Sequence, residues 1–128
     1  MKRMMLLFVI VAAMASTVPA GAHHSFAATY QDDQSQKVEG KLIMFLFRNP
    51  HSFVHVEAPD SNGVMQRWVI EWAAGQALNR QGVTRDTLRS GDHVVVTGKL
   101  GRNPEDHRML LQSLERPLDG WKWSGSFE

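Results

Sequence analysis

The chain contains no cysteine. This absence excludes a disulfide framework and any metal site built from thiolates, so stability must come from packing. After Lys2 and Arg3 there is no run of basic residues, which argues against nucleic acid or an anionic membrane surface as a partner. The chain also lacks a G-x-S-x-G elbow, an H-E-x-x-H pair and a glycine-rich phosphate loop, so the common hydrolase and nucleotide-binding motifs are missing.

The first residues have the pattern of an export signal. Lys2 and Arg3 precede an unbroken apolar run over residues 4–14, and Ala20-Gly21-Ala22 is an A-x-A cleavage site. The run is shorter than the roughly 20 residues that cross a bilayer, although an uncleaved anchor is the alternative. We therefore expect residues 1–22 to be a cleaved signal peptide. The protein would be periplasmic, with no membrane insertion after cleavage, and cleavage after Ala20 is a second option.

Cleavage after residue 22 would leave 106 residues, with 12 Lys and Arg against 13 Asp and Glu. That length suits one domain with a modest core. We expect an extended N-terminal arm over residues 23–36, ending in a polar turn, and a barrel domain over residues 37–128.

The barrel segment shows five strand-like patterns. The first alternates with Leu42 and Met44 on one face, is apolar on both faces in its second half, and has Gly40 at a bend or bulge. Trp68 and Trp72, at strand spacing in the third strand, are expected in the core. The predicted order is strands over 37–48, 52–58 and 65–72, a helix over 73–81, and strands over 93–100 and 108–115.

This element order is that of the OB-fold, a small five-stranded Greek-key barrel. We therefore predict a mainly β, OB-like fold with one short helix. In it, the first strand should pair with both the second and the fourth.

Short motifs in the chain resemble those of an uncharacterised bacterial family of small exported domains. They are His23-His24-Ser25-Phe26, Asn49-Pro50-His51, and Trp68 with Glu71. Further matching residues are Ala77, Leu78, Arg80, Gly82, Thr87, Leu88, Gly91, Asp92, Val94, Val96 and Gly98. Gly75-Gln76 and Val83 depart from the family pattern, which often has Pro-Asn and Trp there. The resemblance implies no established activity.

The N-terminus that cleavage would expose suggests metal chemistry. If His23 becomes the first residue, its α-amine and ring can chelate a metal, and a further imidazole would give a nitrogen-rich site that suits Cu(II). If the chain instead begins Gly21-Ala22-His23, it is a square-planar Cu(II) or Ni(II) binder. The alternative is that His23 and His24 are only the polar start of the arm.

His51 and His107 are the candidates for additional ligands. In an OB-fold, the loops after the first and fourth strands flank the binding face, and these loops carry His51 and His107. We therefore predict His23, His24, His51 and His107 as metal ligands. The alternative role for His51 is to bond the backbone of its own turn. His55 lies about 13 Å further along a regular strand, too far to share a metal with His51.

A ligand face is also predicted, formed by Asn49, Phe53, His55, Trp121 and Trp123. Trp121 and Trp123 either cover an open end of the barrel or stack on a partner. Glu71 stands between large apolar residues, so we expect it to be partly buried in an ion pair with an arginine such as Arg48 or Arg67.

Taken together, these patterns favour a periplasmic, non-catalytic binding module with Cu(II) as its ligand. The second interpretation is a metal-free module that binds an envelope protein or a small ligand, in which the same residues fix the arm to the barrel. The third is a redox enzyme that uses bound copper.

Overall fold

The computed structural model describes residues 24–125, and for His24 and Ser25 the backbone alone. The predicted signal peptide, residues 1–22, and His23 lie outside the described residues. The elements are α2 (His24–Thr29), β1 (Tyr30–Leu46), β2 (Ser52–Pro59), β3 (Met65–Trp72), α3 (Gly75–Arg80), β4 (His93–Gly101), the 3₁₀ helix η1 (Pro104–Asp106), β5 (Arg108–Arg116) and β6 (Trp121–Ser124). Within residues 24–125, no helix has both the length and the apolar character needed to cross a bilayer.

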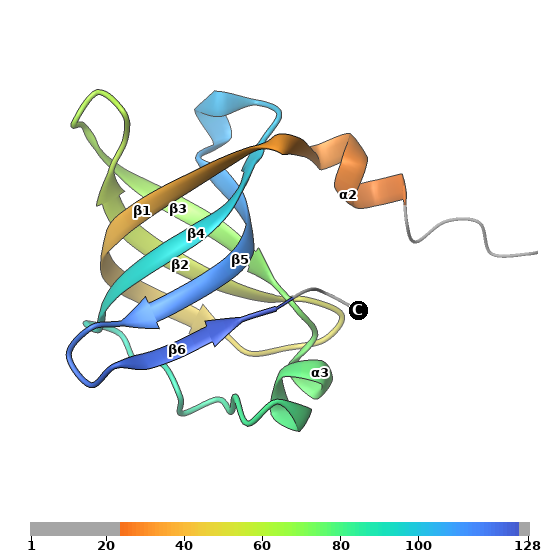
Figure 1. The fold of residues 1–128 in the computed structure, drawn as a ribbon, viewed down its shortest axis with the longest axis vertical. Coiled ribbons are helices and arrows are strands. Elements are labelled where there is room, and N and C mark those ends of the chain that lie inside the picture. Colours follow the sequence, from red (N-terminus) through yellow and green to blue (C-terminus); the bar gives the residue numbers. More distant parts are fainter. Residues whose placement is uncertain (1–23, 126–128) are drawn as a thin grey trace, which may run out of the picture.

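The strands form a barrel, and the long strand β1 is part of its wall, between β2 and β4 (Figure 1). β1 pairs antiparallel with β2 on one side and with β4 on the other, as predicted. β2 continues to β3 and β4 continues to β5. β3 and β5 then pair in parallel and close the ring. The order β1-β2-β3-β5-β4 confirms the predicted all-β fold with barrel-like closure.

The second half of β5 pairs with β6 rather than with β3. The outer edge of β5 is thus shared: residues 108–110 lie against β3 and residues 113–116 lie against β6. The parallel seam between β3 and β5 is short, and the candidate site lies over it.

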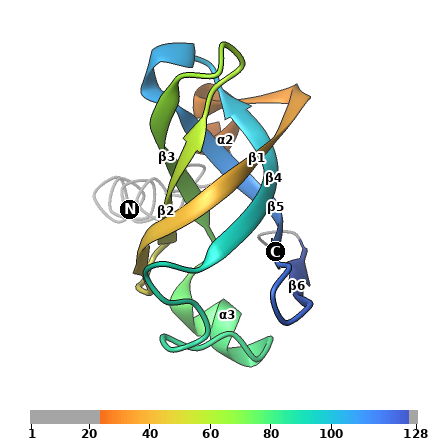
Figure 2. The same ribbon diagram turned by 90° about the vertical axis from the view of Figure 1, so that its left-hand side faces the viewer.

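The core fills the barrel and continues to the end that α3 covers, while the β2–β3 hairpin and η1 stand at the opposite end (Figure 2). Trp68 and Trp72 are 4% and 0% exposed, which confirms the predicted buried face of the third strand. Trp123 of β6 packs edge-on against Trp72, with ring centroids 5.0 Å apart.

The arm differs from its prediction. Instead of an extended segment and a turn, the described part begins with helix α2, and the polar run over residues 31–36 belongs to β1. Ser35 and Gln36 pair with Lys99 and Gly98 of β4. Pairing with a neighbouring strand therefore overrides the low β-propensity of this polar sequence.

A bulge changes the faces of β1. The register to β2 shifts between Leu42 and Met44, so Leu42 is fully buried while Met44 is 46% exposed. The prediction that both share one face is wrong, because one extra residue reverses the alternation. Gly40 stands where a Cβ atom would overlap the carbonyl oxygen of Glu57 on β2, which explains why glycine is needed there.

Candidate functional site

A buried carboxylate lies at the centre of the candidate site. Glu71 is next to Ile70 and Trp72, which are fully buried in the core. Since neighbouring side chains of a strand point to opposite faces, Glu71 points out of the barrel wall. Its side chain is nevertheless only 9% exposed, so other groups must cover and pair it.

Three side chains pair with Glu71. The hydroxyl of Tyr30 donates to Oε2, and Nη2 of Arg108 lies 3.4 Å from the same oxygen. Nδ1 of His51 lies 2.7 Å from the other oxygen, Oε1. Arg108 also donates through Nε to the Tyr30 hydroxyl, at 3.2 Å. We call these four residues the Glu71 network.

The barrel closure assembles this network from four separate strands or loops. Glu71 pairs in register with Leu110 of β5, so Arg108 starts its strand close to the carboxylate. Tyr30 is the first residue of β1, and His51 immediately precedes β2. The parallel seam of β3 and β5 therefore positions the site.

Burial keeps the Tyr30 phenol protonated. Burial, followed by the hydrogen bond and the charge of Glu71, raises the pKa of the Tyr30 phenol well above its usual value. Burial lowers the pKa of Arg108, but its interactions with Tyr30 and Glu71 outweigh this and leave it raised. Tyr30 is thus a neutral donor and Arg108 a cation across the physiological pH range.

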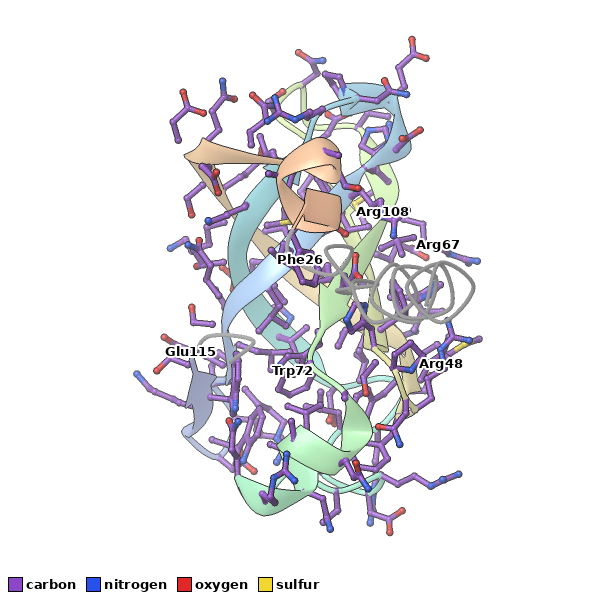
Figure 3. All side chains as sticks on the ribbon, turned by 90° about the vertical axis from the view of Figure 1, so that its right-hand side faces the viewer. Phe26, Arg48, Arg67, Trp72, Arg108 and Glu115 are labelled. Atoms are coloured by element: carbon purple, nitrogen blue, oxygen red, sulfur yellow. The ribbon has the colours of Figure 1, made fainter. Side chains whose placement is uncertain are left out.

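Helix α2 lies in front of β3 and β5 in Figure 3, and its Phe26 packs on two residues of the network. The ring centroid of Phe26 is 5.3 Å from that of His51 and 6.4 Å from that of Tyr30. His51 itself remains 35% exposed. The arm thus packs directly on His51, the histidine that follows Asn49-Pro50.

The turn that carries His51 is anchored to its surroundings. The Asn49–Pro50 peptide bond is cis. The fully buried Ser52 hydroxyl accepts from the backbone N–H of Arg48 at 3.2 Å, and Oδ1 of Asn49 accepts from the N–H of Gln76 on α3 at 3.2 Å. These contacts fix the backbone on both sides of His51, so the direction of its ring is set by the fold.

This geometry determines which ring nitrogen of His51 carries the proton. An ionised carboxylate only accepts hydrogen bonds, so Nδ1 must donate to Glu71, and in the neutral ring the lone pair is then on Nε2. No partner for Nε2 is found among the described residues. A histidine that donates one ring N–H to a carboxylate while the other nitrogen is available is the usual arrangement of a metal ligand.

The described side chains do not by themselves form a metal centre. Among them there is no group of three or more His, Asp or Glu residues arranged to hold an ion. A metal bound by His51 would need ligands from His23 and His24, whose side chains lie outside the description.

The remaining histidines have other neighbours. His107 packs edge-on against Trp68, with centroids 5.2 Å apart, and its Nε2 lies 4.0 Å from Oδ2 of Asp60. His93 is exposed and pairs with Glu39 at 2.8 Å. Burial lowers the pKa of His55, and the charges of Arg67 and Arg48 lower it further.

The residues of the predicted ligand face are spread over the barrel. Phe53 lies under the guanidinium of Arg48, 5.1 Å from its ring centroid, while Asn49 faces α3. Trp121 lies under Arg116, and Trp123 is 7% exposed in the core. Trp123 thus helps to cover the barrel, which is one of its two predicted roles.

Sequence reasoning identified Glu71 but not its partners. The predicted ion pair of a partly buried Glu71 with an arginine is present, but the guanidinium is that of Arg108 and not of Arg48 or Arg67. Tyr30, the other partner, was not predicted to contact Glu71. No local pattern indicates either partner, since Arg108 reaches Glu71 only through the parallel strand pairing.

A family model described as "Family of unknown function (DUF6152)" matches residues 10–109. No curated protein and no solved structure gives a significant match.

Proposed function

The chain belongs to this family of unknown function, and we propose that it is an exported, non-catalytic protein that binds Cu(II) through His23, His24 and His51. The observation that carries the proposal is the 2.7 Å contact between His51 Nδ1 and Glu71. It places the lone pair of the neutral ring on Nε2, and Tyr30 and Arg108 hold the carboxylate that orients the ring.

The position of α2 also supports this proposal. Phe26 packs on the His51 ring, and only three peptide units separate Phe26 from His23. His24 is already the first residue of α2, so a chain that begins at His23 would have its α-amine one residue before the helix that contacts His51. Several nitrogen ligands with no thiolate favour Cu(II) over softer or harder ions.

Export is the premise of this site, because only cleavage creates the α-amine ligand. Intact mass spectrometry of protein from the periplasm should give a chain that begins at His23, because a start at Gly21 would make the first three residues the copper site instead. A chain that retains residues 1–20 would remove the amine and contradict the proposal.

Calorimetry with Cu(II) on the natively processed protein tests the site itself. We expect one bound ion, held more tightly than by a free peptide with the sequence of residues 23–26. His51→Ala should weaken binding by about tenfold or more, and one extra residue before His23 should also weaken it. His93→Ala is the matched control, because His93 also pairs with a glutamate but at an exposed position. Affinity equal to that of the peptide would mean that the barrel adds no ligand.

A further inference from the structure

A separate cavity of about 260 Å³ lies between the β2–β3 hairpin and η1. These two elements stand at the end of the barrel opposite α3 (Figure 2). The start of β1, the tip of the hairpin and the loop before β5 form its polar walls. Trp68, Leu100 and Pro104 supply apolar surface. The cavity shares only Arg108 with the Glu71 network, so it is a different site from the proposed copper site.

Five of the thirteen residues that line this cavity carry side-chain amides. They are Gln31, Gln34, Gln36, Asn62 and Asn103. The amides of Gln31 and Asn103 are engaged, with the carbonyl of Gly101 and with Asp106. No hydrogen bond within residues 24–125 involves the side-chain amides of Gln34, Gln36 or Asn62. The polar run of β1, unusual for a strand, therefore presents unengaged amides to the cavity.

The charged groups at the cavity already have hydrogen-bond partners within the protein. Asp60 accepts from the N–H groups of Asn62 and Val64 and from the amide of Gln66. These bonds, led by that of Gln66, lower its pKa and keep it an anion that is satisfied internally. Arg108 is committed to Tyr30 and Glu71. The walls thus favour an uncharged ligand.

His107 completes the site with a polar ring held in an unusual backbone conformation. Its φ of 45° and ψ of 51° are left-handed, which non-glycine residues rarely adopt and which concentrates at functional positions. The N–H of His107 donates to the carbonyl of Pro104 at the end of η1. The His107 ring packs edge-on against Trp68. The imidazole is therefore held at the cavity wall, near Asp60.

We propose that this cavity binds a neutral, hydroxyl-rich small molecule of the size of one sugar ring. A carboxamide both donates and accepts, which matches a hydroxyl group that does the same. The C–H surface of a sugar ring can lie on the apolar wall. The volume is just below the range of about 300–1,000 Å³ found for drug-sized ligands, which suits a single ring. This inference goes beyond the proposed function and does not depend on copper.

The test is a titration followed by NMR, with D-glucose, D-galactose and N-acetylglucosamine as neutral probes and inorganic phosphate as the charged probe. We expect at least one sugar to cause saturable shifts, in the millimolar range, of the Trp68 indole signal and the side-chain amides of Gln34, Gln36 and Asn62. Phosphate should not shift this set. A sugar that binds only as part of a glycan would shift the same signals when a chitin or cellulose oligosaccharide is added, and not as a free ring.

Two variants locate the binding. Gln34→Ala and Asn62→Ala should each weaken it by about threefold to tenfold, the effect of one lost hydrogen bond. Both side chains are exposed and make no internal bond, so the fold should be unchanged. Gln76→Ala on α3 is the matched control and should bind as the unaltered protein does. The proposal is overturned if no sugar or oligosaccharide gives saturable shifts, if the two variants bind as tightly as the control, or if phosphate shifts these signals instead.

Discussion

Glu71 shows how one side chain joins distant parts of the chain. It accepts from Tyr30, Arg108 and His51, which come from the start of β1, the start of β5 and the turn before β2. Replacing this carboxylate by an amide keeps the size but removes the charge and introduces an N–H next to three donors. Its effect therefore isolates the electrostatic part of the network.

We expect Glu71→Gln to lower the free energy of unfolding by about 1–3 kcal/mol, as measured by urea denaturation. This is below the roughly 3–5 kcal/mol for breaking a fully buried ion pair, because Arg108 is 38% exposed and water screens it. Glu39→Gln removes the same contact to a histidine at an exposed site and should change stability by less than about 0.5 kcal/mol. Equal effects of the two substitutions would contradict the central role of Glu71.

Tyr30 gives a direct optical readout of the network, because it is the only tyrosine in the chain. Its pKa is raised in the folded state, so the folded protein holds this proton at pH values where the unfolded chain has lost it. The stability from Tyr30 is thus fully present below the unfolded pKa of about 10 and is lost as the pH rises above it.

The expected result is that tyrosinate absorbance appears only well above pH 10 and together with unfolding, whereas the urea-unfolded chain ionises near pH 10. Tyr30→Phe should lose less stability per pH unit in this range than the unaltered protein. A folded protein whose tyrosine titrates near pH 10 would show that the phenol is not buried on Glu71.

For single residues, the sequence indicates which side chain is buried and paired, but not the residue with which it pairs. The position of Glu71 among large apolar residues correctly indicated burial and an ion pair. The partner could not be predicted, since Arg48 and Arg67 are nearer in the sequence and Arg108 meets Glu71 only across the β3–β5 pairing.

Among the elements, α2 has the most direct link to function because it covers the network. Phe26→Ala removes the ring that packs on His51 and Tyr30. We expect a loss of about 1–2 kcal/mol, less than for a fully buried phenylalanine. The Tyr30 pKa should also move toward its ordinary value as water reaches the phenol. Ala28→Ser on the exposed side of α2 is the control and should change neither quantity.

β1 depends on a close approach to β2 at Gly40. A methyl group there would overlap the Glu57 carbonyl oxygen, so Gly40→Ala should push the two strands apart. We expect it to destabilise the fold by about 1–3 kcal/mol in thermal or urea unfolding. Lys41→Ala, at an exposed neighbouring position, should have little effect. If Gly40→Ala is as stable as the control, the close approach of the two strands is incorrect.

Element types could be predicted where alternation is strong, as around Trp68 and Trp72. The polar run over residues 31–36 could not be recognised as strand, because its pairing with β4 gives it order that its own side chains do not. The exposure of the Met44 side chain was not predicted for a related reason. A bulge depends on the pairing of two strands, so the sequence of one strand does not reveal it.

For the whole molecule, the barrel brings an N-terminal arm to a rigid turn. The order of strands and helix predicted the barrel, but the location of the arm follows from Phe26 and Tyr30 packing over the closing seam. His51 is thereby oriented by Glu71 on one side and covered by Phe26 on the other. This arrangement is the basis for the proposed shared copper site.

The most direct measurement is NMR of the histidine rings of natively processed protein during addition of Cu(II). Paramagnetic Cu(II) broadens the signals of its ligands, and the six histidines of the chain provide internal controls. Substoichiometric Cu(II) should broaden His51 together with His23 or His24, while His93 and His107 stay sharp. If His51 remains sharp after a full equivalent while the arm histidines are broadened, the arm binds copper without the barrel and the shared site does not exist.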